Sequence, residues 1–144
     1  MNIIIATDIF GDGQYLDDLS EHLHESSNLV SIVTPYDGDS WGLSDESEAY
    51  ATFVRECGHN QYCQRIHSMI MSDQESTFLI GFSAGASAIW RAIGNNCYPN
   101  LAGFCGFYPS RIRDHLGLSP SCASKIIFPY REDSFEVTEA ARVL

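Results

Sequence analysis

The sequence predicts an α/β domain of three layers, in which a mainly parallel sheet of about five strands lies between helices. Five short apolar runs rich in β-branched residues indicate buried strands, at residues 3–7, 30–34, 77–80, 101–107 and 125–128. Stretches with helical character lie between them, at residues 15–23, 47–57 and 84–93. This alternation predicts parallel strands with helices on both faces, and we expect the strand order 2-1-3-4-5.

Turn residues separate the elements of the first half of the chain. Three isoleucines begin the first run, and Gly11-Asp12-Gly13 offers a turn before the first helix. A second turn sequence, residues 37–39, follows the second run. The next helix is predicted by apolar side chains at helical spacing, namely Tyr50, Phe53, Val54 and Cys57.

Residues 58–76 are the hardest part of the chain to assign. Ile66, Met69 and Ile70 favour a second helix before the third strand, although polar residues dominate the segment. Further along, turn sequences at 94–96 and 99–100 separate the helix at 84–93 from the fourth strand.

Length and charge limit the function classes. A chain of 144 residues can bury one sizeable core, so we expect a single domain over residues 1–144. Its 19 acidic residues against 8 basic ones give a net charge of −11, which repels nucleic acid and anionic membrane surfaces. The apolar N-terminal run is too short for a signal peptide or a membrane span, so we expect a cytoplasmic protein. Its five cysteines are expected to be reduced thiols.

A candidate nucleophile stands between the third strand and the following helix. The sequence Gly81-Phe82-Ser83-Ala84-Gly85 has the pattern G-x-S-x-G in strand-to-helix context, which is typical of a nucleophile elbow. Side chains at the two glycine positions would collide with the neighbouring strand and helix. The turn would place the N–H of Ala84 at a helix N-terminus, where it can donate to a developing oxyanion. A coincidental glycine-rich turn is the alternative.

The second oxyanion donor should follow the strand beside the elbow. Strands one and three are neighbours in the expected order, and Thr7-Asp8-Ile9-Phe10-Gly11 leaves the first strand at the corresponding edge. We therefore expect Ile9 and Ser83 to face each other.

Four segments in order along the chain resemble dienelactone hydrolases of the α/β-hydrolase superfamily, at residues 7–11, 81–85, 103–108 and 128–135. The resemblance implies an α/β-hydrolase core that lacks the family's last strand and helix within these residues. It also implies that the N–H groups of Ile9 and Ala84 form the oxyanion hole, with Asp8 at the family's acidic position. Two departures are visible: Ser83 stands where the family nucleophile is typically cysteine, and Asp8 stands where glutamate is common.

The resemblance places the triad acid at Asp133, with Glu132 as the adjacent alternative; an exposed acidic loop would look the same in sequence. No histidine follows Asp133 in the printed sequence, whereas the family's histidine-bearing loop comes after its acid. His115 is the one histidine expected beyond a strand end near the elbow, and an ordinary surface histidine is its alternative. The implied function is hydrolysis of a small ester or lactone through an acyl-enzyme. The alternative is an inactive or truncated hydrolase fold that binds a small ligand or another protein, including a second copy across the last strand.

Other chemistry has weaker support. Cys57, His59, Cys63 and His67 are plausible zinc ligands, but their spacing matches no finger, and an acidic cluster near the first strand lacks the phospho-acceptor arrangement of a magnesium site. The first strand lacks G-x-G-x-x-G, which argues against a dinucleotide-binding fold. From these patterns together we expect no metal and no cofactor. Loop aromatic residues could equally line a substrate pocket or cover the core, namely Tyr36, Trp41, Tyr108, Tyr130 and Phe135.

Overall fold

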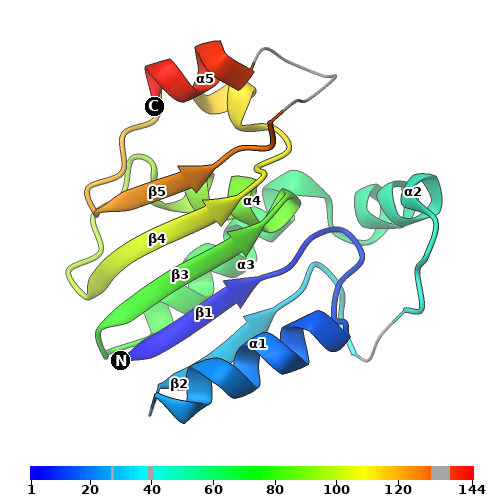
Figure 1. The fold of residues 1–144 in the computed structure, drawn as a ribbon, viewed down its shortest axis with the longest axis horizontal. Coiled ribbons are helices and arrows are strands. Elements are labelled where there is room, and N and C mark those ends of the chain that lie inside the picture. The colour runs from blue at the N-terminus through cyan, green and yellow to red at the C-terminus, as the bar shows by residue number, and fades with distance from the viewer. Residues whose placement is uncertain (27, 39–40, 131–136) are drawn as a thin grey trace.

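The computed structural model describes residues 1–26, 28–38, 41–130 and 137–144 (Figure 1). Its strands are β1 (Asn2–Ala6), β2 (Leu29–Val33), β3 (Thr77–Phe82), β4 (Leu101–Phe107) and β5 (Ser124–Ile127). Its helices are α1 (Gln14–Glu25), α2 (Glu46–Glu56), α3 (Gly58–Ser72), α4 (Ala84–Ile93), the 3-10 helix η1 (Ile112–His115) and α5 (Val137–Val143).

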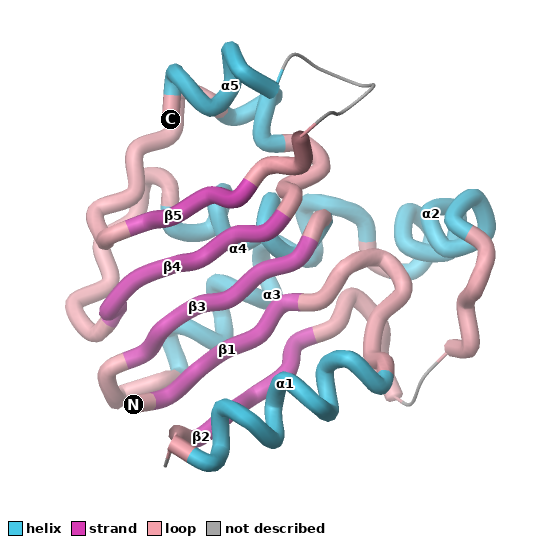
Figure 2. Tube along the Cα trace, viewed as in Figure 1, coloured by secondary structure: helices cyan, strands magenta, loops and turns pink. Residues whose placement is uncertain are grey.

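The five described strands form one parallel sheet in the order β2-β1-β3-β4-β5. This confirms the order expected from the sequence. Helix α1 covers one face over β1 and β2, while α3 and α4 cover the other face (Figure 2). All strands point the same way, so the segments after β1, β3 and β4 meet at one edge of the sheet.

Each face of the sheet has its own core. Under α1, Ile3, Ile5 and Leu16 are buried together. The larger core lies under α3 and α4 and includes Phe53, Tyr62, Leu79, Ile89 and Phe104. Alternate residues of β1 enter opposite cores, which explains why this strand is apolar throughout.

The assignment of residues 58–76 to a second helix is confirmed by α3. Tyr62, Ile66 and Ile70 recur at every fourth position, and all three are buried against the sheet. The polar residues between them lie on the outer face of the helix. Two short helices, η1 and α5, were not foreseen, because helices of four and seven residues depend on packing more than on local pattern. No helix that the structure describes is long and apolar enough to cross a membrane.

Candidate active site

Ser83 joins β3 to α4 in a backbone conformation that side-chain-bearing residues rarely adopt, with φ 49° and ψ −110°. Such a conformation costs on the order of 1–3 kcal/mol and persists only when its surroundings hold it. Here the N–H of Ser83 donates to the carbonyl oxygen of Phe107 in the neighbouring strand at 2.8 Å. The N–H of Ser87 donates to the carbonyl oxygen of Ser83 at 3.1 Å. Sheet and helix therefore hold the strained turn from both sides.

Neither glycine of the motif has room for a side chain. A Cβ on Gly81 would lie 2.6 Å from the Cα of Ala86 in α4. A Cβ on Gly85 would lie 2.4 Å from the carbonyl oxygens of both Ala6 and Thr7. The collisions expected from the sequence are thus found, one with the helix and one with the end of β1.

Ile9 and Ala84 follow neighbouring strands at the same edge of the sheet. Ala6 of β1 is paired with Gly81 of β3, so each residue stands three positions after its member of that pair. Ala84 is the first residue of α4, where the backbone N–H has no partner within the helix. Neither N–H donates a hydrogen bond to another described residue. This arrangement suits two oxyanion donors, and their role stays a prediction.

Asp8 accepts hydrogen bonds within the loop that contains Ile9. Its Oδ1 accepts the N–H of Phe10 at 2.9 Å, and its carbonyl oxygen accepts the N–H of Gly11 at 3.3 Å. Burial raises the pKa of Asp8, and the hydrogen bonds from Phe10, Tyr15 and Gly11 offset part of that rise. In this structure Asp8 shapes the loop.

Two tyrosines from other parts of the chain hold the same loop by hydrogen bonds. The sequence did not predict this positioning role for either of them. The hydroxyl of Tyr36 donates to the carbonyl oxygen of Ile9. Tyr62, fully buried in α3, contacts the carbonyl oxygens of Thr7 at 2.9 Å and Val33 at 3.0 Å. Burial raises the pKa of Tyr36 to about 12 and raises that of Tyr62 further. The regular spacing of Tyr62 with Ile66 and Ile70 was the available signal that its side chain points inward.

The structure places the remaining candidates as follows. Asp133 and Glu132 lie outside the described residues. His115 ends η1 and lines a cavity between α3 and α4, and Ser83 is not among the residues that line it. Burial lowers the pKa of His115, and the charge of Arg91 lowers it further. The structure therefore does not bring His115 and Ser83 into one cavity.

The loop aromatic residues differ in burial. Tyr36 is buried and covers the core edge, whereas Trp41, Tyr108 and Tyr130 are exposed. Phe135 lies outside the described residues. Within the described ranges, no three His, Cys, Asp or Glu side chains gather in a way that could hold a metal ion.

Comparison with known proteins places this geometry among hydrolase folds. No family model matches the chain. It is 28% identical over 145 residues to the uncharacterized protein YczH of Bacillus subtilis strain 168, a match that covers 94% of the chain and 66% of YczH. The chain thus spans slightly less than two thirds of that relative.

Two solved structures are similar in fold. One is a protein of Klebsiella pneumoniae subsp. pneumoniae MGH 78578 assigned as a dienelactone hydrolase, with a TM-score of 0.63 and 16% identity over 99% of this chain and 82% of that one. The other is esterase PE8, with a TM-score of 0.58 and 16% identity over 99% of this chain and 74% of that one. At this identity the likeness concerns the fold, and the chain has a dienelactone hydrolase-like α/β fold.

Proposed function

We propose that this chain acts as a serine hydrolase of the dienelactone hydrolase-like type on a small ester or lactone, with Ser83 as the nucleophile. One observation supports this most: Ser83 occupies a strained turn at φ 49° that two glycines make sterically feasible. A strained non-glycine residue between a strand and a helix serves a nucleophile, because the turn exposes the hydroxyl at the edge of the sheet.

In the proposed reaction, the Ser83 hydroxyl oxygen attacks the carbonyl carbon and its proton passes to a general base. The carbonyl oxygen becomes an oxyanion, to which the N–H groups of Ile9 and Ala84 donate. The bond to the leaving alcohol then breaks, the alcohol takes up the proton, and an acyl-enzyme remains. Water attacks this ester and releases the acid together with free Ser83.

The base and its orienting acid are part of the proposal. Asp133 is the proposed acid, with Glu132 beside it, and His115 is the candidate base within this chain. His115 would need to move toward Ser83, because it lines a different cavity in the structure. A neutral imidazole is the form that accepts a proton, and the lowered pKa of His115 keeps it neutral at pH 7.

Both structural neighbours are hydrolases by name, which supports a hydrolase over an inactive binding module. The net charge of −11 is consistent with a small, uncharged substrate and with no nucleic-acid or membrane partner. A cytoplasmic location without a cofactor is also proposed.

An activated ester tests this function. Mixed rapidly with p-nitrophenyl acetate, the chain should release about one equivalent of p-nitrophenol in a burst, and the mass of the protein should rise by one acetyl group on the peptide containing Ser83. Ser83→Ala should abolish both signals, while Ser47→Ala, on the exposed surface of α2, should keep them. A folded wild-type chain that shows neither burst nor acetylation would contradict the proposal.

A further inference from the structure

A second polar site lies one helical turn from the elbow. A cavity of about 150 Å³ opens between α3, α4 and the segment after β4. Its polar lining comes from His59, Asn60, Ser87, Arg91, Arg111 and His115. Ser87 belongs to the cavity lining and also contacts the elbow, because its N–H donates to the carbonyl oxygen of Ser83. Two of the chain's 8 basic residues and two of its 5 histidines thus meet here, in a chain of net charge −11.

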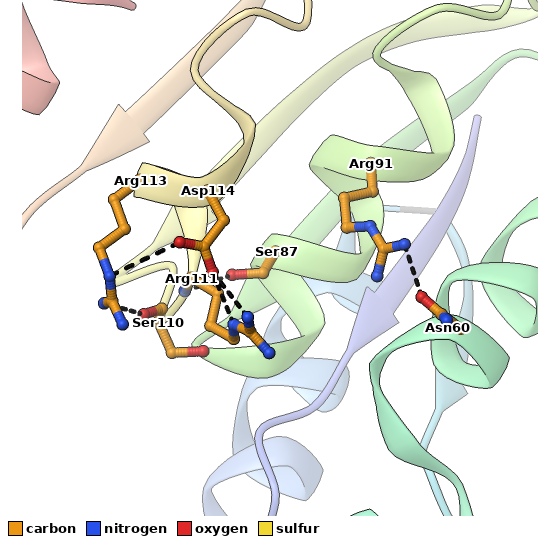
Figure 3. A network of polar contacts seen from close by, with 7 residues as sticks. All are labelled: Asn60, Ser87, Arg91, Ser110, Arg111, Arg113 and Asp114. Atoms are coloured by element: carbon orange, nitrogen blue, oxygen red, sulfur yellow. Dashed lines mark hydrogen bonds and ion pairs between the residues drawn. The ribbon is translucent and has the colours of Figure 1, made fainter.

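Most of the polar groups that line this cavity are hydrogen-bond donors. Arg91 donates from Nη2 to the side-chain oxygen of Asn60 at 2.7 Å, which leaves the amide NH₂ of Asn60 as a donor (Figure 3). The Oγ of Ser87 accepts the N–H of Arg111 at 3.2 Å, so the hydroxyl proton remains available. No carboxylate lines the cavity, and among the described residues Arg91 has no acidic partner.

The nearest carboxylate belongs to Asp114, which lies outside the lining. It pairs with Arg111 at 2.8 Å and lies 3.8 Å from Arg113, as Figure 3 shows. This pairing orients Arg111 and offsets part of the positive charge. Of the two arginines that line the cavity, Arg111 is paired with this carboxylate, so the positive charge of Arg91 remains beside the cavity.

His59 adds an unsatisfied polar atom. Its Nε2 is buried and has no hydrogen-bond partner among the described residues. Burial lowers the pKa of His59, and Arg111 and Arg91 lower it further, while Asp114 opposes them. A buried nitrogen without a hydrogen-bond partner is costly, and His59 is one of the residues that line the cavity.

We propose that this cavity binds a small oxyanion, the phosphate or carboxylate group of a free anion or of a small metabolite. The donors of the lining suit such a group, and so does Arg91, which has no acidic partner in the part of the chain that the structure describes. The cavity is smaller than the roughly 300–1,000 Å³ of pockets for drug-sized ligands, which fits a single oxyanion. Ser83 does not line this cavity, and anion binding does not depend on ester hydrolysis, although the two proposals share His115.

Binding of an anion should be coupled to proton uptake. The charged groups around the two histidines are Arg91, Arg111 and Asp114. The two arginines lower the pKa values of His59 and His115, and Asp114 opposes them. A bound anion favours the imidazolium forms, so it raises the pKa values of His59 and His115. Affinity should therefore increase as the pH falls through the pKa values that the two histidines have in the anion-bound protein.

Imidazole NMR of the whole 144-residue chain tests this proposal. Sulfate, which does not titrate in this range, is added in exchange for chloride at constant ionic strength. The resonances of His59 and His115 should shift saturably and their titration midpoints should rise, while those of His22 and His24 on the exposed surface of α1 should not respond. Acetate in place of sulfate distinguishes a carboxylate site from a tetrahedral oxyanion site. Absence of a saturable shift with both anions would overturn the proposal.

Matched variants test which residues bind the anion. Arg91→Gln should weaken sulfate binding by about tenfold or more, since a charge-assisted hydrogen bond is lost. Arg111→Gln should weaken it similarly and provides a second test should Arg91→Gln fail to fold. Arg55→Gln, which changes the net charge equally at an exposed position of α2 outside the cavity lining, should bind as the wild type does. Ser83→Ala should also bind normally; unchanged affinity in both cavity variants would refute the assignment.

Discussion

Ser83 is held in its turn by hydrogen bonds to Phe107 and Ser87 and by the absence of side chains at Gly81 and Gly85. The glycines do not supply flexibility at this point. They remove atoms that would otherwise meet the backbones of α4 and β1, so that β3 and α4 can approach as closely as the turn requires.

Gly85→Ala is therefore expected to damage both stability and the elbow. The new Cβ would meet backbone oxygens of Ala6 and Thr7, which cannot move aside as a flexible side chain could. We expect a loss of about 1–3 kcal/mol or more in the free energy of unfolding, measured by urea denaturation. Gly117→Ala, with nothing within 4 Å of its Cβ, should change stability by less than about 1 kcal/mol. Equal stability of the two variants would refute this explanation of the motif.

Tyr36 provides a test of the Ile9 loop. Tyr36→Phe removes the hydrogen bond to the carbonyl oxygen of Ile9 while keeping the ring in the core. We expect the rate of Ser83 acylation by p-nitrophenyl acetate to fall about fivefold, which corresponds to loss of roughly 1 kcal/mol of positioning. Tyr50→Phe, at an exposed position of α2, is the control. An unchanged acylation rate in Tyr36→Phe would remove Tyr36 from the positioning role.

The sequence identified the elbow and its steric requirement but not the tyrosines that support it. The motif is local, so its glycines can be interpreted from the strand and helix around them. The hydroxyls of Tyr36 and Tyr62 contact residues 27 and 55 positions away, and no local pattern predicts such partners. The role of Asp133 as the triad acid stays a prediction, because this residue lies outside the described residues.

At the scale of the elements, the N-terminal ends of β1 and β3 are joined by one carboxylate. Asp73, which follows α3, accepts from the side-chain nitrogen of Asn2 at 2.8 Å and from the hydroxyl of Thr77 at 2.8 Å. It also accepts the N–H of Glu75 at 3.1 Å. Burial raises the pKa of Asp73, and the hydrogen bonds together outweigh that effect, so the pKa is lowered from 3.8.

Asp73→Ala is expected to lower the free energy of unfolding by about 1–2 kcal/mol at pH 7. Because the folded-state pKa lies below 3.8, this contribution is present above that pH and is lost as the pH falls through the folded-state pKa. The thermal unfolding curves of the variant and the wild type should therefore differ at pH 7 and converge once the pH is below the folded-state pKa of Asp73. Glu21→Ala, exposed on α1, controls for loss of a charge. A difference that persists undiminished at low pH would contradict the role of the carboxylate.

Elements with long apolar or strongly periodic stretches were predicted well from the sequence. Strand β4 and helix α4 have the predicted bounds, and the other strands are displaced by one or two residues at their ends. The helices η1 and α5 were missed because each is short and gains its stability from neighbours. Trp90 illustrates this, since its ring nitrogen donates to the carbonyl oxygen of His115 at the end of η1.

At the scale of the whole molecule, the sheet has two edges, β2 and β5. The N–H of Phe104 donates to the carbonyl oxygen of Ala123, and Phe104 pairs with Ser124, so the backbone groups of Ser124 point away from β4. An outward-pointing row of this kind can pair with a second copy, which is one of the alternatives that the sequence left open.

Pairing of two copies across β5 predicts that sedimentation equilibrium shows a dimer. Ser124→Pro would remove the outward N–H while leaving the ladder to β4 intact, so it should shift the protein to monomer without unfolding it. A wild-type chain that stays monomeric at all concentrations would refute pairing across β5.

The central claim is that Ser83 is an activated nucleophile, and a fluorophosphonate probe tests it most directly. Intact mass and peptide mapping should show one probe per chain, attached to Ser83, for the wild type and for Ser47→Ala, and none for Ser83→Ala. If wild-type protein that is folded by circular dichroism remains unlabelled, or if Ser83→Ala is labelled equally, Ser83 is not the nucleophile.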